Sequence, residues 1–354
     1  MLNLINNIIS YNLFKKFGFP KVLPSILTLN VNNWCNSKCK TCNIWMNNPV
    51  EKIKEELALK EFQKIFAHYG KTYWITVTGG EPFLRKDLTD IIKTVYEKTG
   101  PKLMTITTNG TIPEKIASLT SQILGSCKKL NLIVNVSLDG IGKQHDGIRG
   151  FKGNYERVVQ TVNGLKALNQ DRLTVGINSI ISVFNVSDFL KIYKHITEDL
   201  KPDSYIAEIA ENRAKLSNMK LKITPETNDY QKVLLFLIDS LKRENREKSV
   251  PEIVRILRIE FYRYLMKAYT LKNFEGIASA YIMHNGDISV SDSRPYVIGN
   301  LREVDYDFKK LWFNENAENF RKTMDNEYST LAVNAFYTNF ICNPKNVLGL
   351  VLSS

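Results

Sequence analysis

Three cysteines near the start of the chain have the residue type and spacing best suited to chemistry. Cys35, Cys39 and Cys42 follow one another as C-x3-C-x2-C, directly after an apolar stretch typical of a β-strand. Iron–sulfur clusters are held by cysteine thiolates, and a cluster with only three protein thiolates keeps one iron free to bind a small molecule. The spacing therefore predicts an iron–sulfur centre with an open iron, where a reaction can take place.

Two other uses of these cysteines fit the sequence less well. A structural zinc site needs four ligands, and the nearest histidine, His68, lies beyond a predicted helix. A disulfide with one spare thiol is the second alternative. Against it, the chain has five cysteines, no secretory signal pattern and enough residues to build a large core without cross-links.

Composition narrows the function classes. The 354 residues are 44% hydrophobic, and 48 basic against 36 acidic residues give a formal net charge of +12. The lysines are scattered and not gathered into a dense run with aromatic residues between them, so we expect no specific nucleic-acid partner. Residues 1–23 suit an amphipathic segment that packs on the domain, with peripheral membrane contact as the less favoured alternative. The sequence predicts a cytoplasmic enzyme.

Hydrophobic periodicity alternates between short β-branched runs and longer helical patterns over residues 24–225. This alternation predicts parallel β/α units, and six strands with five linking helices fit a partial (β/α)6 TIM-like barrel. The predicted strands are 26–31, 73–78, 103–108, 132–138, 174–182 and 205–209, and the predicted helices are 58–69, 87–99, 113–124, 154–169 and 187–199.

Polar and glycine-rich clusters follow the first four predicted strands. In β/α barrels the active site lies where the strands end, so these clusters are expected to meet at one mouth. After the cysteines come Gly79-Gly80-Glu81-Pro82, then Thr107-Thr108-Asn109-Gly110, then Ser137-Leu138-Asp139-Gly140.

The last third of the chain has a different pattern. Residues 226–275 are predicted to be wholly helical and to form a connector that packs on the barrel. Residues 276–354 are predicted to form a small α+β appendage that contains a hairpin turn at Asn285-Gly286-Asp287.

The cysteine loop and the three strand-end motifs, taken in this order, resemble the radical S-adenosylmethionine (radical SAM) superfamily. The resemblance covers roughly residues 24–210 and implies that Cys35, Cys39 and Cys42 bind three irons of one [4Fe-4S] cluster, while S-adenosylmethionine chelates the fourth. It also implies that the turn at Gly79, Gly80, Glu81 and Pro82 accepts hydrogen bonds from the ammonium group of that cofactor. It implies cofactor contacts for four further residues: Asn109, Ser137, Asp139 and Arg149.

The resemblance further implies a reaction and its partners. One electron from an external donor of the flavodoxin or ferredoxin type cleaves S-adenosylmethionine to methionine and a 5′-deoxyadenosyl radical, which abstracts hydrogen from a substrate. The substrate is predicted to be a peptide or protein, with lipid, cofactor or sugar substrates or a non-catalytic scaffold as alternatives. Thr41 stands where relatives often have an aromatic residue, and Trp45 is a candidate to replace it. Polar residues in the last two barrel strands, Asn178, Ser182 and Glu208, are expected either to contact substrate or to face solvent.

The C-terminal region resembles a SPASM-type auxiliary-cluster module without its cysteines. Gly276-x9-Gly286-x4-Ser291 keeps the spacing of the module's C-x9-G-x4-C motif, but Gly276 and Ser291 stand where thiolates would be. Cys342 is the one cysteine left in the tail and cannot hold a cluster alone. We therefore expect a metal-free cover over the substrate side of the barrel, and a small buried Cys127 before the fourth strand.

Overall fold

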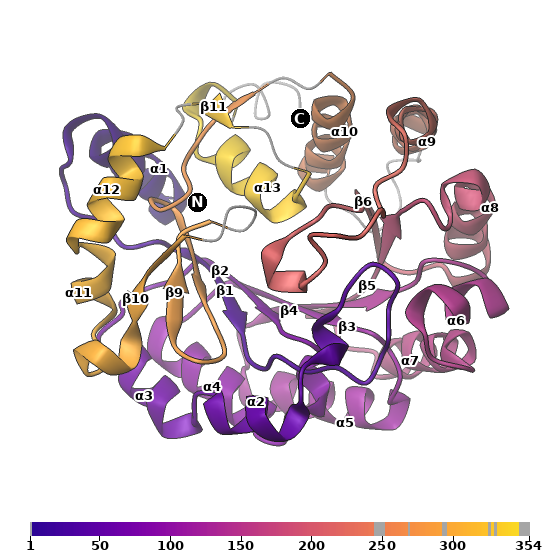
Figure 1. Cartoon of the computed structure of the whole chain (residues 1–354), viewed down its shortest axis with the longest axis horizontal. Coiled ribbons are helices and arrows are strands. Elements are labelled where there is room, and N and C mark those ends of the chain that lie inside the picture. The colour runs from indigo at the N-terminus through magenta and orange to yellow at the C-terminus, as the bar shows by residue number, and fades with distance from the viewer. Residues whose placement is uncertain are drawn as a thin grey trace.

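The computed structural model describes residues 2–243, 252–267, 270–291, 296–324, 327–328 and 331–346. Its centre is a curved nine-stranded sheet with the strand order β10-β9-β8-β1-β2-β3-β4-β5-β6 (Figure 1). Strands β1 to β6 pair in parallel, which confirms the predicted open, partial β/α barrel. These strands are β1 (Ile26–Asn30), β2 (Trp74–Thr78), β3 (Leu103–Thr108), β4 (Asn131–Ser137), β5 (Leu173–Ile181) and β6 (Ser204–Ile209).

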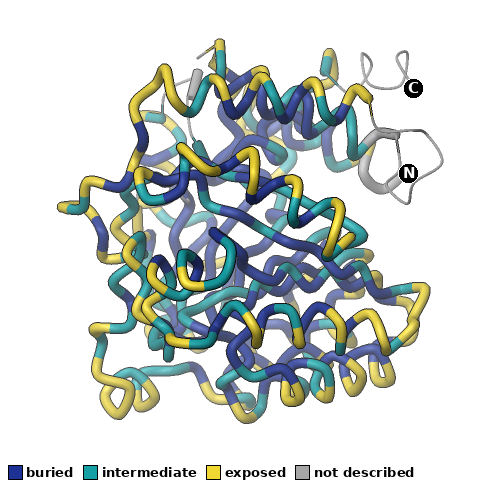
Figure 2. The backbone as a smooth tube through the Cα atoms, turned by 90° about the vertical axis from the view of Figure 1, so that its right-hand side faces the viewer, coloured by how far each residue is buried: buried dark blue, intermediate teal, exposed yellow. Residues whose placement is uncertain are grey.

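Helices cover the outer face of this sheet, and the backbone between the layers is mostly buried (dark blue in Figure 2). Apolar side chains fill the space between the two layers. Leu27, Val77 and Val134 are fully buried because strands with helices on one face and a filled interior on the other have no solvent side. The helices of this layer are α3 (Leu59–Ala67), α4 (Leu88–Thr99), α5 (Pro113–Ser126), α7 (Asn154–Ala167) and α8 (Phe189–Lys194), the last continued by the π-helical turn η4 (His195–Leu200).

The predicted barrel elements are all present, and their boundaries differ from the predicted ones by at most two residues when η4 is counted with α8. Local chemistry explains several of these ends. Helix α5 begins with Pro113, whose missing N–H costs nothing in a first turn, and α4 ends at Gly100, which adopts the left-handed conformation (φ 60°). Two short helices were not predicted: α2 (Pro49–Glu55) and α6 (Lys143–Arg149).

The connector predicted at residues 226–275 is helical over α9 (Thr227–Arg243) and α10 (Glu252–Lys267). Residues 244–251 and 268–269 lie outside the described residues. The prediction of a wholly helical segment is wrong at β7 (Leu271–Lys272), which pairs with β11 (Glu327–Tyr328). That pairing joins residues more than fifty positions apart, so local periodicity did not reveal it.

The predicted C-terminal α+β region is continuous with the barrel sheet. Strand β8 (Ser279–Ile282) pairs in parallel with β1, and β9 (Asp287–Ser289) and β10 (Val297–Asn300) follow it as antiparallel neighbours. The predicted turn between β8 and β9 is confirmed, with Gly286 at φ 93°. Three helices complete the region: α11 (Phe308–Trp312), α12 (Glu315–Thr323) and α13 (Val333–Ile341).

The predicted N-terminal helix is α1 (Leu2–Phe17), and it packs on the domain as expected. The Tyr11 hydroxyl donates to Ser25 Oγ (2.8 Å), and the Asn12 amide donates to the Cys342 carbonyl (2.9 Å) at the other end of the chain. Within the described part of the chain, no helix is long and apolar enough to cross a membrane.

Candidate functional site

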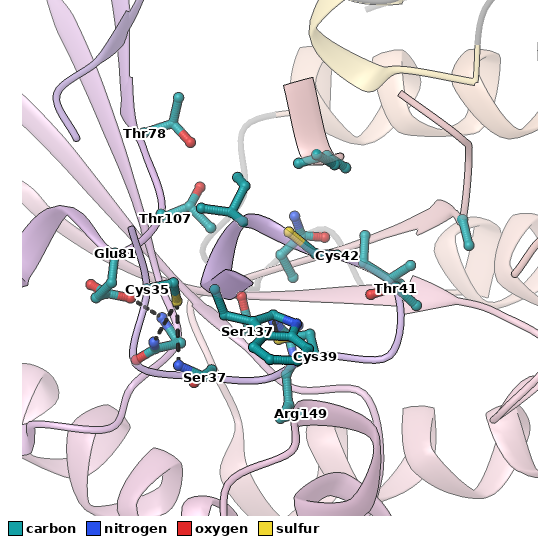
Figure 3. Close-up of a pocket in the computed structure, with 18 of the residues that line it drawn as sticks. Cys35, Ser37, Cys39, Thr41, Cys42, Thr78, Glu81, Thr107, Ser137 and Arg149 are labelled. Carbon is teal, nitrogen blue, oxygen red and sulfur yellow. Dashed lines mark hydrogen bonds between the residues drawn. The ribbon is translucent and has the colours of Figure 1, made fainter. Parts of the chain in front are cut away.

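The three cysteines of the C-x3-C-x2-C motif lie on the loop that follows β1 and line a cavity of about 220 Å³ (Figure 3). The other walls of this cavity come from the ends of β2, β3, β4, β5 and β6 and from the loop after β6. All five cysteines of the chain are free thiols. The prediction that the strand-end motifs meet at one mouth is therefore confirmed.

The turn after β2 holds the start of the cysteine loop through very close backbone contact. The Gly80 N–H lies 3.0 Å from both the Asn32 carbonyl and the Asn32 side-chain oxygen, and the Glu81 N–H donates to the Trp34 carbonyl (3.1 Å). A Cβ at Gly80 would overlap the Trp34 carbonyl, and one at Gly79 would overlap Asn32. Both positions therefore require glycine, because any side chain would push the cysteine loop away.

Glu81 connects β2 to β3 behind the cysteines. Its buried carboxylate accepts hydrogen bonds from the Thr108 hydroxyl (2.8 Å), the Asn109 N–H (2.7 Å) and the Phe83 N–H (3.2 Å). Burial raises the pKa of Glu81 to about 7, while the three donors oppose that shift by stabilising the charged form. The carboxylate therefore serves to fix the end of β3.

Asn109, held by Glu81, in turn positions the side chain of Cys35. Its amide nitrogen donates to Asn36 Oδ1 (2.8 Å) and lies 3.5 Å from Cys35 Sγ, and its amide oxygen accepts from Thr111. The Ser37 N–H also donates to Cys35 Sγ (3.4 Å). Donors aimed at a sulfur stabilise a thiolate, so Asn109 acts on the cysteine through its position.

Arg149 provides a positive charge beside Cys39. It ends α6, and its guanidinium lies 4.0 Å from Cys39 Sγ and forms a 2.7 Å ion pair with the buried carboxylate of Asp139. Gly150 follows with φ 63°, and a Cβ there would overlap the Lys38 carbonyl. The end of α6 is thus pressed against the cysteine loop, with Arg149 held in place by Asp139.

His145 supports this pair from behind. Its ring is fully buried, the Asp139 N–H donates to Nδ1 (3.1 Å), and the side-chain amide of Asn154 lies 3.1 Å from Nε2. Burial, and then the nearby Arg149, lower the pKa of His145 to about 3. The ring is therefore neutral and orients Asp139.

Burial alone holds the three cysteines as neutral thiols, so a bound metal would be needed to stabilise their thiolate forms. Burial raises the pKa of Cys35 to about 12 and that of Cys42 to about 11, and it also raises the pKa of Cys39. Metal ions bind the thiolate and so deprotonate such groups. Iron would supply the positive charge that these sulfurs lack.

The shape of the ligand set separates a cluster from a single ion. Among the residues that the structure describes, no three His, Cys, Asp or Glu side chains converge as ligands of one metal ion. In a [4Fe-4S] cluster each thiolate binds a different iron, so the sulfurs need not converge. The three cysteines thus fit the cluster better than zinc.

Three buried polar atoms of the cavity residues are left without a partner within the described structure. They are Ser37 Oγ, Trp45 Nε1 and Asn178 Oδ1. Buried polar atoms in folded proteins are nearly always hydrogen-bonded, and exceptions mark places where a ligand or water binds. The cavity therefore has room and unmet hydrogen-bonding capacity for a polar cofactor next to the cysteines.

The predicted site residues divide into two groups. Six of them line the cavity: Gly79, Gly80, Glu81, Asn109, Ser137 and Arg149. Pro82 begins the short helix η2 (Pro82–Leu84) and is buried, and Asp139 lies behind Arg149, so neither forms part of the cavity wall. Of the polar strand residues, Asn178 and Glu208 line the cavity and are hydrogen-bonded to each other (3.1 Å). Ser182 is fully buried and bonds Asn185 instead.

Sequence reasoning missed the loop after β6, residues 211–223, which lies against the cysteine loop. The buried Asn218 amide donates to the Thr41 carbonyl (2.8 Å) and the Glu211 carbonyl (3.2 Å), and the Asn43 N–H donates to the Leu216 carbonyl (2.9 Å). Asparagine side chains that bond to backbone are common in irregular loops, and this composition was the one available signal. Leu216 and the neighbouring Arg213 extend the cavity wall.

The positions that resemble lost auxiliary-cluster cysteines are close together. The Gly276 N–H donates to the Val290 carbonyl (3.0 Å), and the Ser291 hydroxyl donates to Glu275 (2.9 Å). Cys342 is buried elsewhere, in a group with Tyr11 and Phe274. Cys127 is fully buried at the end of α5, as predicted.

Part of the chain matches the sequence profile of a known protein family. Residues 29–196 match the sequence profile of the radical SAM superfamily, which confirms the resemblance found in the motifs. This superfamily is an enzyme family that uses a [4Fe-4S] cluster and S-adenosylmethionine, with a reductant and a substrate.

Several relatives extend over different parts of the chain. Fe-coproporphyrin III synthase of Methanosarcina barkeri is 26% identical over 83% of this chain and 75% of its own. AdoMet-dependent heme synthase of Oleidesulfovibrio alaskensis is 24% identical over 93% and 84%. GTP 3′,8-cyclase of Vibrio vulnificus is 36% identical, but this chain spans only 48% of that protein.

Solved structures agree with the barrel. Streptococcus suis SuiB bound to S-adenosylmethionine superposes with a TM-score of 0.63 at 16% identity, over 90% of this chain and 72% of the other. The enzyme anSMEcpe with bound AdoMet and Cp18Cys peptide gives 0.61 at 15% identity, over 94% and 100%. At this identity the likeness concerns the fold.

Proposed function

We propose that this chain cleaves S-adenosylmethionine reductively and uses the product radical to abstract hydrogen from a peptide or protein substrate. The observation that carries the proposal is one cavity in which three half-buried free cysteines meet the ends of five barrel strands and polar atoms that lack partners among the described residues. When bound, the cluster and S-adenosylmethionine supply a one-electron cleavage that yields a 5′-deoxyadenosyl radical.

The roles of the residues follow from their positions. Cys35, Cys39 and Cys42 would hold the cluster, with Arg149 balancing the charge beside Cys39. The backbone of Gly79 and Gly80 can approach an ammonium group because neither residue has a side chain. Ser137 and Asn178 line the next part of the cavity and offer hydrogen bonds to a hydroxylated ligand.

The substrate side is formed by Glu208, by the loop 211–223 and by the C-terminal region. Glu208 bonds Asn178 and also accepts from the Val333 N–H at the start of α13 (3.4 Å). Residues 276–346 would serve as a cover without a second cluster, because Gly276 and Ser291 cannot supply thiolates. The fold shared with SuiB and anSMEcpe, both solved with peptides, supports a peptide substrate.

A second candidate substrate is a tetrapyrrole. Two of the relatives that align with three quarters or more of their own length are named Fe-coproporphyrin III synthase and AdoMet-dependent heme synthase. Electrons would come from a flavodoxin or ferredoxin, and the free thiols suit the reducing conditions of the cytoplasm.

The test is anaerobic cluster reconstitution followed by dithionite and S-adenosylmethionine. We expect about four irons per chain and formation of 5′-deoxyadenosine. Deuterated peptides and deuterated coproporphyrin are then supplied separately, and deuterium in the 5′-deoxyadenosine identifies the substrate class. Protein that binds no iron under these conditions would contradict the proposal as a whole. Transfer from the porphyrin alone would overturn the peptide assignment and leave the cofactor chemistry intact.

A further inference from the structure

Helix α1 is apolar on two opposite faces, and only one of them is used inside the protein. Its inner face holds Ile8, Tyr11 and Phe14, which are at most 9% exposed and pack on the rest of the chain. Tyr11 and Phe14 contact the group around Phe274 and Cys342. This face fully accounts for the attachment of α1 to the domain.

The other face carries an exposed apolar row. Ile5, Ile9, Leu13 and Phe17 are 46%, 52%, 41% and 65% exposed, and Phe19, just beyond the helix, is 74% exposed. We call these five residues the outer stripe. Residues four positions apart lie on one side of a helix, so the stripe runs along α1 from Ile5 to Phe17, about 18 Å at 1.5 Å per residue. Single exposed apolar residues are ordinary, but a continuous row marks a contact surface.

Positive charge flanks the outer stripe. Residues 1–50 contain five lysines and no aspartate or glutamate. Lys16 lies over the Phe17 ring (4.9 Å) and Lys21 over the Phe313 ring (5.2 Å). Lys272 adds a fourth charge next to Lys15, since it donates to Asn12 of the same helix (2.9 Å). Burial, and then Lys272, lower the pKa of Lys15 to about 8.

We propose that α1 docks this protein on an anionic lipid surface, with the outer stripe inserted between lipid chains and Lys16, Lys21 and Lys272 at the phosphate level. A helix with an apolar row and flanking lysines is the usual form of such an anchor. A second copy of this chain fits less well, because pairing two stripes would bring two sets of lysines together. The inference does not rest on the proposed substrate.

The test is sedimentation of the full-length protein with vesicles of phosphatidylglycerol and phosphatidylcholine, compared with phosphatidylcholine alone. We expect binding to the anionic vesicles at low salt, weaker binding at high salt, and little binding to neutral vesicles. Ile9→Ser with Phe17→Ser should weaken binding about a hundredfold, since burial of each apolar side chain contributes about tenfold or more. Lys16→Glu with Lys21→Glu should weaken it about tenfold or more.

Matched controls are available on α9 and α8. Leu235→Ser with Leu190→Ser removes apolar residues of similar exposure (50% and 42%), and Lys232→Glu removes an exposed charge there. These variants should bind vesicles like the unmodified protein, and the stripe variants should keep their circular dichroism spectrum and 5′-deoxyadenosine formation.

Three outcomes would overturn the proposal. One is that the full-length protein fails to sediment with anionic vesicles at low salt. Another is that control and stripe variants lose binding equally. A third is that sedimentation velocity shows a dimer abolished by Ile9→Ser with Phe17→Ser while vesicle binding is absent; this result would assign the stripe to a second copy.

Discussion

The two sides of the cavity use their polar side chains in opposite ways. On the side built by the ends of β2, β3 and β4, Glu81, Asn109 and Asp139 form their hydrogen bonds and ion pairs with other parts of the protein. On the side built by β5, β6 and the loop 211–223, Asn178 has an amide oxygen without a partner among the described residues. The first side, β2 to β4, is thus fixed before any ligand binds. The second side keeps hydrogen-bonding capacity for a ligand, as do Ser37 and Trp45 on the cysteine loop.

This difference indicates how the work is divided. A rigid first side positions the cluster loop, which the chemistry common to the superfamily requires. Specificity for a substrate can arise on the second side. Its unpaired polar atoms favour binding only of a ligand that forms hydrogen bonds with them. The predictions below test this division in order of decreasing effect.

Removal of a cysteine should give the largest effect. Cys39→Ala should reduce 5′-deoxyadenosine formation to background and lower the iron content, because two thiolates cannot hold the cluster. Liquid chromatography of the nucleoside product and iron analysis measure both quantities. Cys127→Ala, at a buried thiol outside the cavity, should keep its iron and its activity. Equal loss of iron and activity in both variants would show that Cys39 is not a cluster ligand.

The ion pair behind the cluster loop should come next. Asp139→Asn leaves the Arg149 guanidinium buried without its counter-charge, and breaking a buried pair in this way costs about 3 to 5 kcal/mol. Urea unfolding and the electron paramagnetic resonance spectrum of the reduced cluster should both change. Glu55→Gln removes an exposed partner of Lys52 and should cost less than about 1 kcal/mol. If Asp139→Asn changed neither the urea unfolding nor the spectrum, the first side would not be rigid in the way described.

The neutral His145 should make the first side sensitive to acid. Since burial lowers its pKa from 6.5 to about 3, the unfolded chain binds the extra proton between these values and the folded protein does not. Stability from this group is therefore lost as pH falls below 6.5, by about 1.4 kcal/mol per pH unit. Urea unfolding of cluster-free protein at pH 7 and 4.5 should show a loss about 2.5 kcal/mol smaller in His145→Gln. Identical losses would exclude a buried neutral ring.

The loop after β6 should give the smallest effect on stability. Asn218→Ala removes the donor to the Thr41 and Glu211 carbonyls, which costs about 1 kcal/mol. We expect 5′-deoxyadenosine formation without substrate to continue, while the amount of product per S-adenosylmethionine consumed falls. Lys220→Ala changes an exposed residue of the same loop and should leave that ratio intact. If Asn218→Ala lowered 5′-deoxyadenosine formation more than it lowered the amount of product per S-adenosylmethionine consumed, the loop would act on the cofactor and not on the substrate.

The barrel was predictable because each strand is short, apolar and followed by a polar or glycine-rich turn. Gly79 and Gly80 were found by their motif, and the structure adds the reason that a Cβ would meet Asn32 and Trp34. Helix α6 was missed because its seven residues contain a glycine and span fewer than two full turns of apolar periodicity. Arg149 was therefore placed by resemblance alone.

Local sequence patterns could not predict which strands pair when their residues lie far apart in the chain. Nothing around Ser279 indicates that β8 joins β1 instead of forming a separate sheet, since pairing depends on a partner about 250 residues away. Likewise, Asp139 was expected to contact the cofactor, and only the position of Arg149 shows that its carboxylate is already occupied.

The pairing of β8 with β1 affects how the protein folds during its synthesis on the ribosome. At about 5 to 20 residues per second, the open edge of β1 waits roughly 12 to 50 seconds for its partner. An uncovered edge invites pairing with other nascent chains. The edge of β1 therefore stays exposed to other chains until β8 is synthesised and pairs with it.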